Sequence, residues 1–307
     1  MKVIGVGDAD VDIYLDVDHI PGRDEKVVAR AVSFYPGGMV ANFLVALAQL
    51  GTPCAFHGSV GDDEFGRLSL AQMADSGVDI SCAIVRPGER TYFCIVMLDE
   101  SGEKALVVAP TSCLFPRLEH ISEECIARAQ HLHTTAADVR TTVRIVQIAK
   151  QHGLTVSVDV EVGAVLQGRG LSSLLSLVDV MFVNHRAVDL LCRSDSLADW
   201  ATRMIAKGTR VVCITKGDQG ALVVSGSETV DIGAFAVPVK DTTGAGDCFA
   251  AGFIHGWLRQ WPLSKVAIFA NAVGAISVTR RGGRSNPPTI SEVTAFLKER
   301  GVDLNIM

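Results

Sequence analysis

The stretch VKDTTGAGDCFAAGF, residues 239–253, combines an acid with an unusual density of small residues. Gly244, Ala245 and Gly246 come directly before Asp247, and aromatic residues then recur at helical spacing. Glycines let a backbone turn tightly and expose its N–H groups, and the first N–H groups of a helix have no intrahelical acceptor. The pattern therefore predicts a helix that begins near residue 245, with an anion site at its N-terminus.

Asp247 has two interpretations at this position. An acid in the first turn of a helix is stabilised by the helix dipole, which is an ordinary structural role. The second interpretation is a general base. In phosphoryl transfer a carboxylate accepts the proton of the attacking hydroxyl, while nearby donors hold the phosphoryl group. Residues 244–247 would supply both parts of such a site.

Composition excludes several classes of partner. The chain has 307 residues and a net charge of −6, which argues against nucleic acid or an anionic membrane as the main partner. The N-terminus lacks the apolar core of a signal peptide, and no apolar run reaches the roughly 18 residues of a membrane helix. The eight scattered cysteines are typical of buried thiols in a reducing compartment, so we expect a cytoplasmic protein.

Apolar runs and helical patterns alternate along the chain. Runs such as residues 179–184 and 209–215 are apolar on consecutive positions, as in strands that are buried on both faces. Amphipathic segments such as residues 39–51 end on a glycine, which is a helix stop signal. We expect a single α/β domain over residues 1–307, with a mainly parallel central sheet and helices on both faces.

Two segments interrupt this alternation. Residues 12–35 and 91–109 have the pattern of β-hairpins, the second with a turn at DESGEK, residues 99–104. Hairpins that leave a parallel sheet predict a small separate β layer, which could serve as a lid. Because exposed strand edges favour pairing with another chain, we expect a homodimer through this layer.

The quoted stretch also resembles a known family. DTTGAGDCFAAGF, residues 241–253, is similar to the C-terminal signature of the ribokinase-like, or PfkB, carbohydrate kinases. GGMVANFLVALAQLG, residues 37–51, resembles their N-terminal signature, and GDADVDIYLD, residues 7–16, resembles their sugar-binding strand. With residues 214–223 and 277–288, the resemblance extends over essentially the whole chain. It implies a ribokinase-like fold and ATP-dependent phosphorylation of a primary hydroxyl of a small sugar.

The resemblance assigns roles to individual residues. It implies that Asp247 is the catalytic base and that residues 244–246 form the anion hole. Four residues match the sugar-binding positions of the family: Asp10, Asp12, Gly38 and Asn42. Four others match positions that lie along ATP: Thr215, Gly217, Gly220 and Asn271.

Two ions are implied as well. Mg²⁺ should arrive with ATP, held mainly by phosphate oxygens and water. A monovalent cation, K⁺, is implied near the anion hole. Its oxygen ligands, mostly backbone carbonyls, would come from Asp241, Thr243, Ser277, Arg280, Gly282 and Asn286.

Three departures from the family pattern leave alternatives open. Asn184 is present, but Ala187 stands where relatives have an acid that helps to organise Mg²⁺, and Asp189 is two positions away. Met39 replaces a lysine found in ribokinases proper, which makes the chain more similar to the fructokinase and ketodeoxygluconate kinase branches. Residues 131–140 contain no equivalent of a sugar-binding glutamate. The alternatives are a nucleoside kinase of the same family and a non-catalytic sugar- or nucleotide-binding protein.

Overall fold

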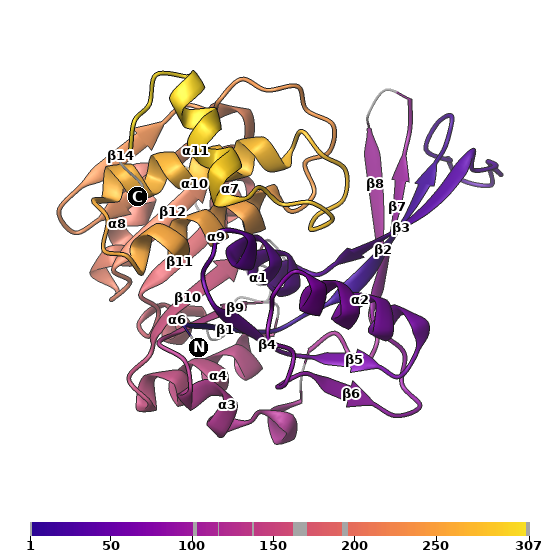
Figure 1. Ribbon diagram of the computed structural model, residues 1–307, viewed down its shortest axis with the longest axis horizontal. Helices are drawn as coiled ribbons and strands as arrows, with labels where there is room; N and C mark the ends of the chain where they lie inside the picture. The colour runs from indigo at the N-terminus through magenta and orange to yellow at the C-terminus, as the bar shows by residue number, and fades with distance from the viewer. Residues whose placement is uncertain are drawn as a thin grey trace.

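A computed structural model describes residues 2–100, 103–115, 117–136, 138–161, 171–191 and 196–304. Within these parts of the chain the largest sheet has eight strands (Figure 1). They are β1 (Val3–Val6), β4 (Cys54–His57), β9 (His131–Thr135), β10 (Thr155–Val160), β11 (Val180–Asn184), β12 (Val211–Thr215), β13 (Ala221–Ser225) and β14 (Thr229–Ile232). The order is β14-β13-β12-β11-β10-β9-β1-β4, and every pair is parallel except those that β13 makes with β12 and β14.

Helices cover both faces of this sheet and enclose two hydrophobic cores. One core contains residues of α1 (Met39–Gln49), α9 (Ala245–Trp257), α10 (Leu263–Ser277) and α11 (Ile290–Glu299). The other contains residues of α3 (Glu123–Ala127), α4 (Val139–Gln151), α6 (Leu171–Leu175), α7 (His185–Leu191) and α8 (Leu197–Ala206).

Neighbouring strand residues enter opposite cores. Val3 packs into the first core and Ile4 into the second, and Phe182 and Met181 divide in the same way. This explains the consecutive apolar residues of the strands and confirms the predicted α/β class. None of the described helices is long and apolar enough to span a bilayer.

A second sheet projects beside the central one (Figure 1). Its strands, in the order β3-β2-β7-β8, are β3 (Ala31–Gly37), β2 (Asp10–Asp16), β7 (Phe93–Leu98) and β8 (Lys104–Ala109). The pairs β2–β3 and β7–β8 are antiparallel, as expected for two hairpins, and a parallel β2–β7 pairing joins them. Residues 101–102 of the predicted turn lie outside the described residues. Helix α2 (Glu64–Asp75) and the short strands β5 (Ser59–Gly61) and β6 (Ile84–Arg86) lie near its base.

The expectation that every cysteine is a free thiol is wrong for one pair. Cys82 and Cys125 form a disulfide, with their Cα atoms 6.3 Å apart. The two residues are 43 positions apart in the chain, so their spacing did not predict a disulfide. The fold brings α3, which contains Cys125, next to the segment before β6, which contains Cys82. Cys54, Cys94, Cys113, Cys213 and Cys248 are free and buried, as expected.

Candidate active site

A cavity of about 430 Å³ lies where the two sheets face each other. The carboxyl ends of central strands form one wall, with Asp159 of β10, Asn184 of β11 and Thr215 of β12. Leu106 and Val108 of β8 line it from the four-stranded sheet. Ten of the residues selected from the sequence line this cavity: Asp10, Asp12, Gly38, Asn42, Thr215, Thr243, Gly244, Ala245, Gly246 and Asp247.

The N-terminus of α9 forms one end of the cavity. Gly244 precedes the helix with φ of 74°, in the left-handed region, and a Cβ there would lie 2.5 Å from the carbonyl oxygen of Gly283. A Cβ at Gly246 would meet no protein atom within 4 Å. No side chain caps this helix, and its first N–H groups have no intrahelical acceptor. The N–H of Ala245 donates to the carbonyl oxygen of Thr242 at 3.3 Å, so the donors that remain for the cavity, at the positive end of a helix dipole, are those of Gly246 and Asp247.

Asp247 lies in the first turn of α9 and is held by α1. The Nδ2 of Asn42 donates to its Oδ2 at 2.8 Å, across 205 positions of sequence. Asn42 Oδ1 is buried and has no hydrogen-bond partner among the described residues. Asn42 lines the cavity as expected, and it also orients the carboxylate of Asp247, a role that the sequence did not indicate.

Burial raises the pKa of Asp247 well above its usual range. The hydrogen bond from Asn42 opposes this shift, whereas the acidic side chains of Asp159, Asp8 and Glu161 reinforce it. Only 8% of the residue is exposed. A carboxylate with a raised pKa is a stronger proton acceptor once it is ionised, and general base catalysis requires such an acceptor.

Asp10 and Asp12 line the cavity from β2, and this part of its wall is called the β2 end, as distinct from the α9 end at the N-terminus of α9. Both lie on β2, which begins at Asp10, so they belong to the four-stranded sheet rather than to the end of a central strand. Burial raises the pKa of Asp10 well above its usual range, with a further contribution from Asp12. Burial also raises the pKa of Asp12 to about 6, against the opposing charge of the fully buried Arg284. Asp10 Oδ1 is buried without a partner among the described residues.

Asp8 is a buried residue of the cavity wall that the sequence analysis left without a role. Its carboxylate accepts the backbone N–H groups of Met39 (2.9 Å) and Val40 (3.1 Å), the first residues of α1. Gly38 has no side chain to cap that helix, so Asp8 supplies the cap from a distant loop. A helix that starts directly after two glycines was the available signal for such a cap.

Two further acids line the cavity and were missed by the sequence analysis. Burial raises the pKa of Asp159 to about 8, and the nearby charge of Glu161 contributes.

Ala187, which stands where an acid was expected, is fully buried in the second hydrophobic core, and Asp189 is exposed. Asn184 lines the cavity and accepts the backbone N–H of Ala187 at 2.8 Å. Oxygen ligands are therefore present here, although not at position 187.

The residues expected along ATP divide into two groups. Thr215 lines the cavity, whereas Gly217, Gly220 and Asn271 do not. A Cβ at Gly220 would lie 2.0 Å from the carbonyl oxygen of Ile232, so close packing explains this glycine. Asn271 donates its Nδ2 to the carbonyl oxygen of Gly233 at 2.8 Å and joins α10 to the segment after β14.

The residues expected around a monovalent cation come from the loop before α9, residues 241–243, from Ser277 at the end of α10, and from a second loop, residues 278–286. Asp241 accepts the N–H of Gly282 at 3.0 Å and the N–H of Thr243 at 2.9 Å. These hydrogen bonds outweigh burial and lower the pKa of Asp241. Arg280 donates to the carbonyl oxygen of Asn286 in its own loop at 2.8 Å. Ser277 donates to the carbonyl oxygen of Gly274 within α10 at 2.8 Å.

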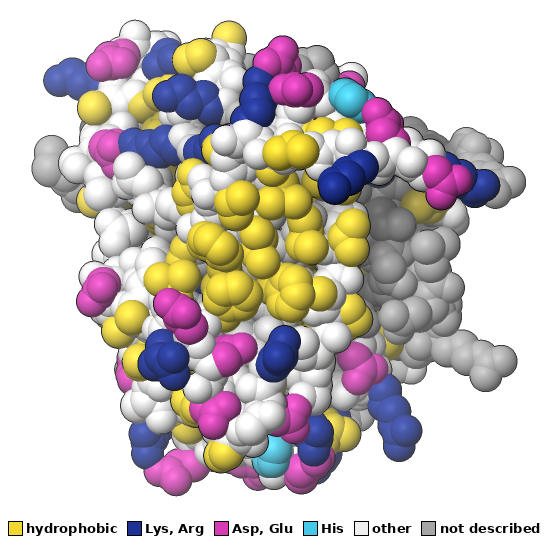
Figure 2. All heavy atoms as spheres, turned by 90° about the vertical axis from the view of Figure 1, so that its right-hand side faces the viewer, with side chains coloured by type: hydrophobic (Ala, Val, Ile, Leu, Met, Phe, Trp, Pro, Cys, Tyr) yellow, Lys and Arg dark blue, Asp and Glu magenta, His cyan; other side chains and the backbone are white. Residues whose placement is uncertain are grey.

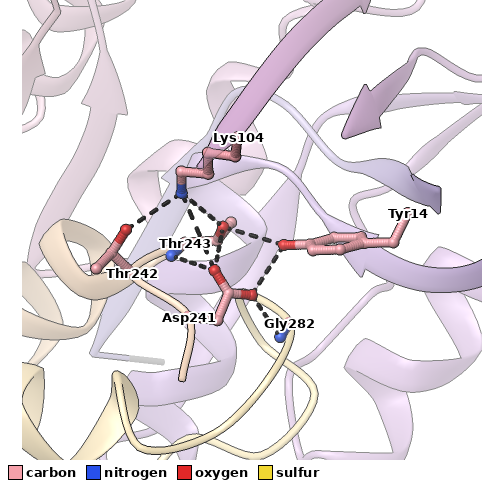
Figure 3. Close-up of polar contacts among 6 residues, drawn as sticks. All are labelled: Tyr14, Lys104, Asp241, Thr242, Thr243 and Gly282. Carbon is pink, nitrogen blue, oxygen red and sulfur yellow. Dashed lines mark hydrogen bonds and ion pairs between the residues drawn. The ribbon is translucent and has the colours of Figure 1, made fainter. Parts of the chain in front are cut away.

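Two side chains of the four-stranded sheet meet these loops and were also missed. Tyr14 of β2 donates its hydroxyl to Asp241 at 2.9 Å and to Thr243 at 3.0 Å (Figure 3). The Nζ of Lys104 on β8 donates to the hydroxyl oxygens of Thr242 and Thr243 and lies 4.0 Å from Oδ1 of Asp241. Nothing in the local sequence distinguishes this lysine or this tyrosine from ordinary strand residues.

Comparison with known proteins gives consistent matches. Residues 2–290 match the model of the pfkB family carbohydrate kinases. The ATP-dependent ribose-1-phosphate kinase of Halopiger xanaduensis is 33% identical, over 98% of this chain and 99% of that protein. Fructokinase-1 of Zea mays is 29% identical, over 92% and 95% of the two chains. A ribokinase II of E. coli, solved with ATP and Mg²⁺, superposes with a TM-score of 0.86 at 26% identity, over 97% and 99%.

Proposed function

The chain belongs to the pfkB family of carbohydrate kinases, and we propose that it transfers the γ-phosphoryl group of ATP to a primary hydroxyl of a small sugar. Its relatives support a sugar or nucleoside kinase that uses ATP. The observation that carries the finer proposal is the cavity itself. Its wall combines amide donors and Asp247 at the N-terminus of α9 with the carboxyl groups of Asp10 and Asp12 on β2.

In the proposed reaction Asp247 is the general base. It accepts the proton of the attacking hydroxyl as the new oxygen–phosphorus bond forms and the bond to the ADP oxygen breaks. Three features support this role: its place at the N-terminus of α9, its burial, and the hydrogen bond by which Asn42 orients it. The N–H groups at residues 244–247 stabilise the charge that develops on the phosphoryl oxygens.

The β2 end of the cavity suits hydroxyl groups. An ionised carboxylate accepts hydrogen bonds from two neighbouring hydroxyls, and a protonated one can also donate. Asp10 and Asp12 therefore bind the sugar in this proposal, beside Gly38. The residues that the structure describes along the cavity wall include six acids and no lysine or arginine. A neutral sugar fits this wall better than the phosphorylated sugar named for the Halopiger relative.

The cavity also suits the ions that the family implies. Asp159, Glu161 and Asn184 present oxygen atoms, which Mg²⁺ prefers, and they would hold it through water beside the phosphates of ATP. Mg²⁺ when bound would neutralise charge on the β- and γ-phosphates. We propose a K⁺ ion beside Asp241, with backbone oxygens of the second loop as its remaining ligands. Turnover measured in K⁺ and in a tetramethylammonium salt tests this; equal rates would contradict it.

We propose that the chain forms a single α/β domain and that the four-stranded sheet is its lid. We also propose that a second copy of the chain covers the outer face of this sheet. Figure 2 shows a broad hydrophobic surface on this side of the molecule. One row of paired residues, Phe34–Ile13–Ile95–Val107, crosses all four strands, and its two ends are about half exposed (52% each). Val107→Lys should shift a dimer to monomer in sedimentation analysis; an unchanged species would contradict the proposal.

We propose a cytoplasmic location, because the reaction consumes ATP. The disulfide between Cys82 and Cys125 gives this proposal no support, since such bonds are rare in reducing compartments. Fractionation of cells that express the tagged chain tests it, and recovery in a secreted fraction would contradict it.

The substrate can be identified by an ADP-release assay with Mg²⁺ and ATP. The panel would contain neutral sugars, sugar acids, ribose-1-phosphate and nucleosides. We expect turnover with a neutral sugar, with the phosphate on a primary hydroxyl by NMR. Turnover only with nucleosides would favour the nucleoside kinase alternative. ATP and sugar binding without any turnover would favour the binding protein.

A further inference from the structure

Lys104 links the four-stranded sheet to the loop that leads into α9 (Figure 3). It is the first residue of β8, and its Nζ donates to the hydroxyl oxygens of Thr242 (3.2 Å) and Thr243 (3.3 Å). Both threonines line the cavity, and Gly244 follows directly. The ammonium group therefore lies at the entrance to the proposed anion hole.

The present partners of Lys104 bind it weakly. Two of them are neutral hydroxyls, and hydrogen bonds to neutral acceptors are weaker than those to anions. Its ionic partner, Asp241 Oδ1, is 4.0 Å away and already accepts the N–H and the hydroxyl of Thr243. The side chain of Lys104 is 33% exposed. The ammonium group can therefore leave these partners for an anion without a large rearrangement.

The charge of the cavity creates a need for such a group. A triphosphate must enter beside Asp159, Glu161 and Asp247, among the six acids of the described wall. Arg284 is fully buried and donates to Ser69, so its charge acts on the acids at the β2 end. Lys104 brings a positive charge beside Thr243, next to Gly244, and the same charge also acts on Asp12.

Tyr14, on strand β2 of the same sheet, also contacts the loop that leads into α9. Its hydroxyl donates to Asp241 and Thr243, and Asp241 in turn accepts the N–H of Gly282. The sheet is thus attached to the loop by a neutral group as well as by the charged Lys104. This pair permits a direct comparison, because Tyr14→Phe removes a link without removing a charge.

We propose that Lys104 is a further catalytic residue, which contacts the transferring phosphoryl group when the four-stranded sheet closes over the cavity. The inference rests on the proposed function. Lys104 keeps its protons throughout, since the proton of the sugar hydroxyl goes to Asp247, and its contribution is electrostatic. Because the charge comes from the four-stranded sheet, the position of this sheet decides whether the charge reaches the phosphoryl group.

The test compares Lys104→Met, Lys104→Arg and Tyr14→Phe with the wild type. Lys26→Met, an exposed lysine in the β2–β3 connection, is the matched control. We expect Lys104→Met to lower kcat by about 10- to 100-fold with little change in the KM of the sugar. Lys104→Arg should restore at least a tenth of the activity, Tyr14→Phe should lose less than Lys104→Met, and Lys26→Met should match the wild type. A kcat of Lys104→Met within threefold of the wild type would overturn the inference.

A binding measurement keeps the inference separate from the proposed function. The preference for Mg·AMP-PNP over Mg·ADP is measured by calorimetry, which requires no turnover. We expect Lys104→Met to reduce this preference about tenfold, and Lys26→Met to leave it unchanged. If the wild type shows no turnover but this difference is found, only the proposed function fails. If the wild type turns over and the preference of Lys104→Met is unchanged, only the inference about Lys104 fails.

Discussion

The two ends of the cavity are built in opposite ways. At the α9 end, small residues such as Gly246 leave backbone N–H groups uncovered beyond the one that Ala245 donates to Thr242, so this end presents donors. At the β2 end, Asp10 and Asp12 present carboxyl oxygens, so this end presents mainly acceptors. An anion fits the first end and a set of hydroxyls fits the second. The polarity of the cavity therefore gives a substrate its direction, with a hydroxyl brought to Asp247 from the acceptor side.

The two ends also differ in what holds them. The donor end follows from local helix geometry and from the left-handed conformation of Gly244. The acceptor end depends on distant residues, because burial raises the pKa of both acids while Arg284 opposes it from a segment near the C-terminus. A change at the donor end should affect phosphoryl transfer, whereas a change at the acceptor end should affect sugar binding.

Substitutions of Gly244, Asp12 and Asp159 should have effects of decreasing size, and the largest, a loss of kcat, is expected at the α9 end. Gly244→Ala places a Cβ 2.5 Å from the carbonyl oxygen of Gly283 and strains a residue with φ of 74°. The loop must shift, which misaligns the amide donors. We expect kcat to fall by about 10²- to 10³-fold and stability by about 1 kcal/mol, from ADP-release kinetics and urea unfolding.

Gly51 provides the control for this variant. It has φ of 77° with no atom within 4 Å of a Cβ, and it does not line the cavity. Gly51→Ala should lose a similar amount of stability and keep its kcat. If both variants keep their activity, the donor end is not an anion hole.

A smaller effect is expected at the acceptor end. Asp12→Asn removes a charged acceptor, so the KM of the sugar should rise by about 10- to 100-fold while the KM of ATP stays unchanged. Because the pKa of Asp12 is about 6, the wild-type KM should also rise as the pH falls below 6 and Asp12 becomes protonated. Asp12→Asn should lack this dependence. The exposed Asp18→Asn is the control, and an equal rise in the KM of ATP would contradict the division between the ends.

The smallest effect concerns Asp159 and the stability of the unliganded protein. Its pKa is about 8 when folded and near 4 when unfolded, so its contribution to stability is present below pH 4 and is lost as the pH rises to 8. Asp159→Asn should therefore be more stable than the wild type at pH 8, by on the order of 2 kcal/mol, and similar at pH 4. Urea unfolding at both pH values measures this. A variant that is less stable at pH 8 would show that the carboxylate is paired.

The sequence predicted what depends on local pattern. The start of α9 at Ala245 follows from glycines placed before a helical repeat, and the parallel sheet follows from strands that are apolar on consecutive residues. The two hairpins were predicted, but their union through β2 and β7 was not, because pairing between distant strands leaves no local signal.

The missed features all join distant parts of the chain. Asn42 and Asp247 are 205 positions apart, Tyr14 and Asp241 are 227 apart, and Lys104 and Thr242 are 138 apart. Asp159 enters the cavity because parallel strands end at one edge of the sheet, which brings together acids that are unrelated in sequence. The role of Asn271 along ATP stays a prediction; in the fold its amide donates to the carbonyl oxygen of Gly233.

The most direct test of the account is a comparison of binding and turnover for Asp247→Asn. Calorimetry would measure its affinity for Mg·AMP-PNP and for the identified sugar, and ADP release would measure its kcat. The account predicts affinities within about threefold of the wild type and a kcat lower by about 10²- to 10⁴-fold, because the general base is lost and the cavity is kept. A kcat within tenfold of the wild type would contradict the role of Asp247 as the base.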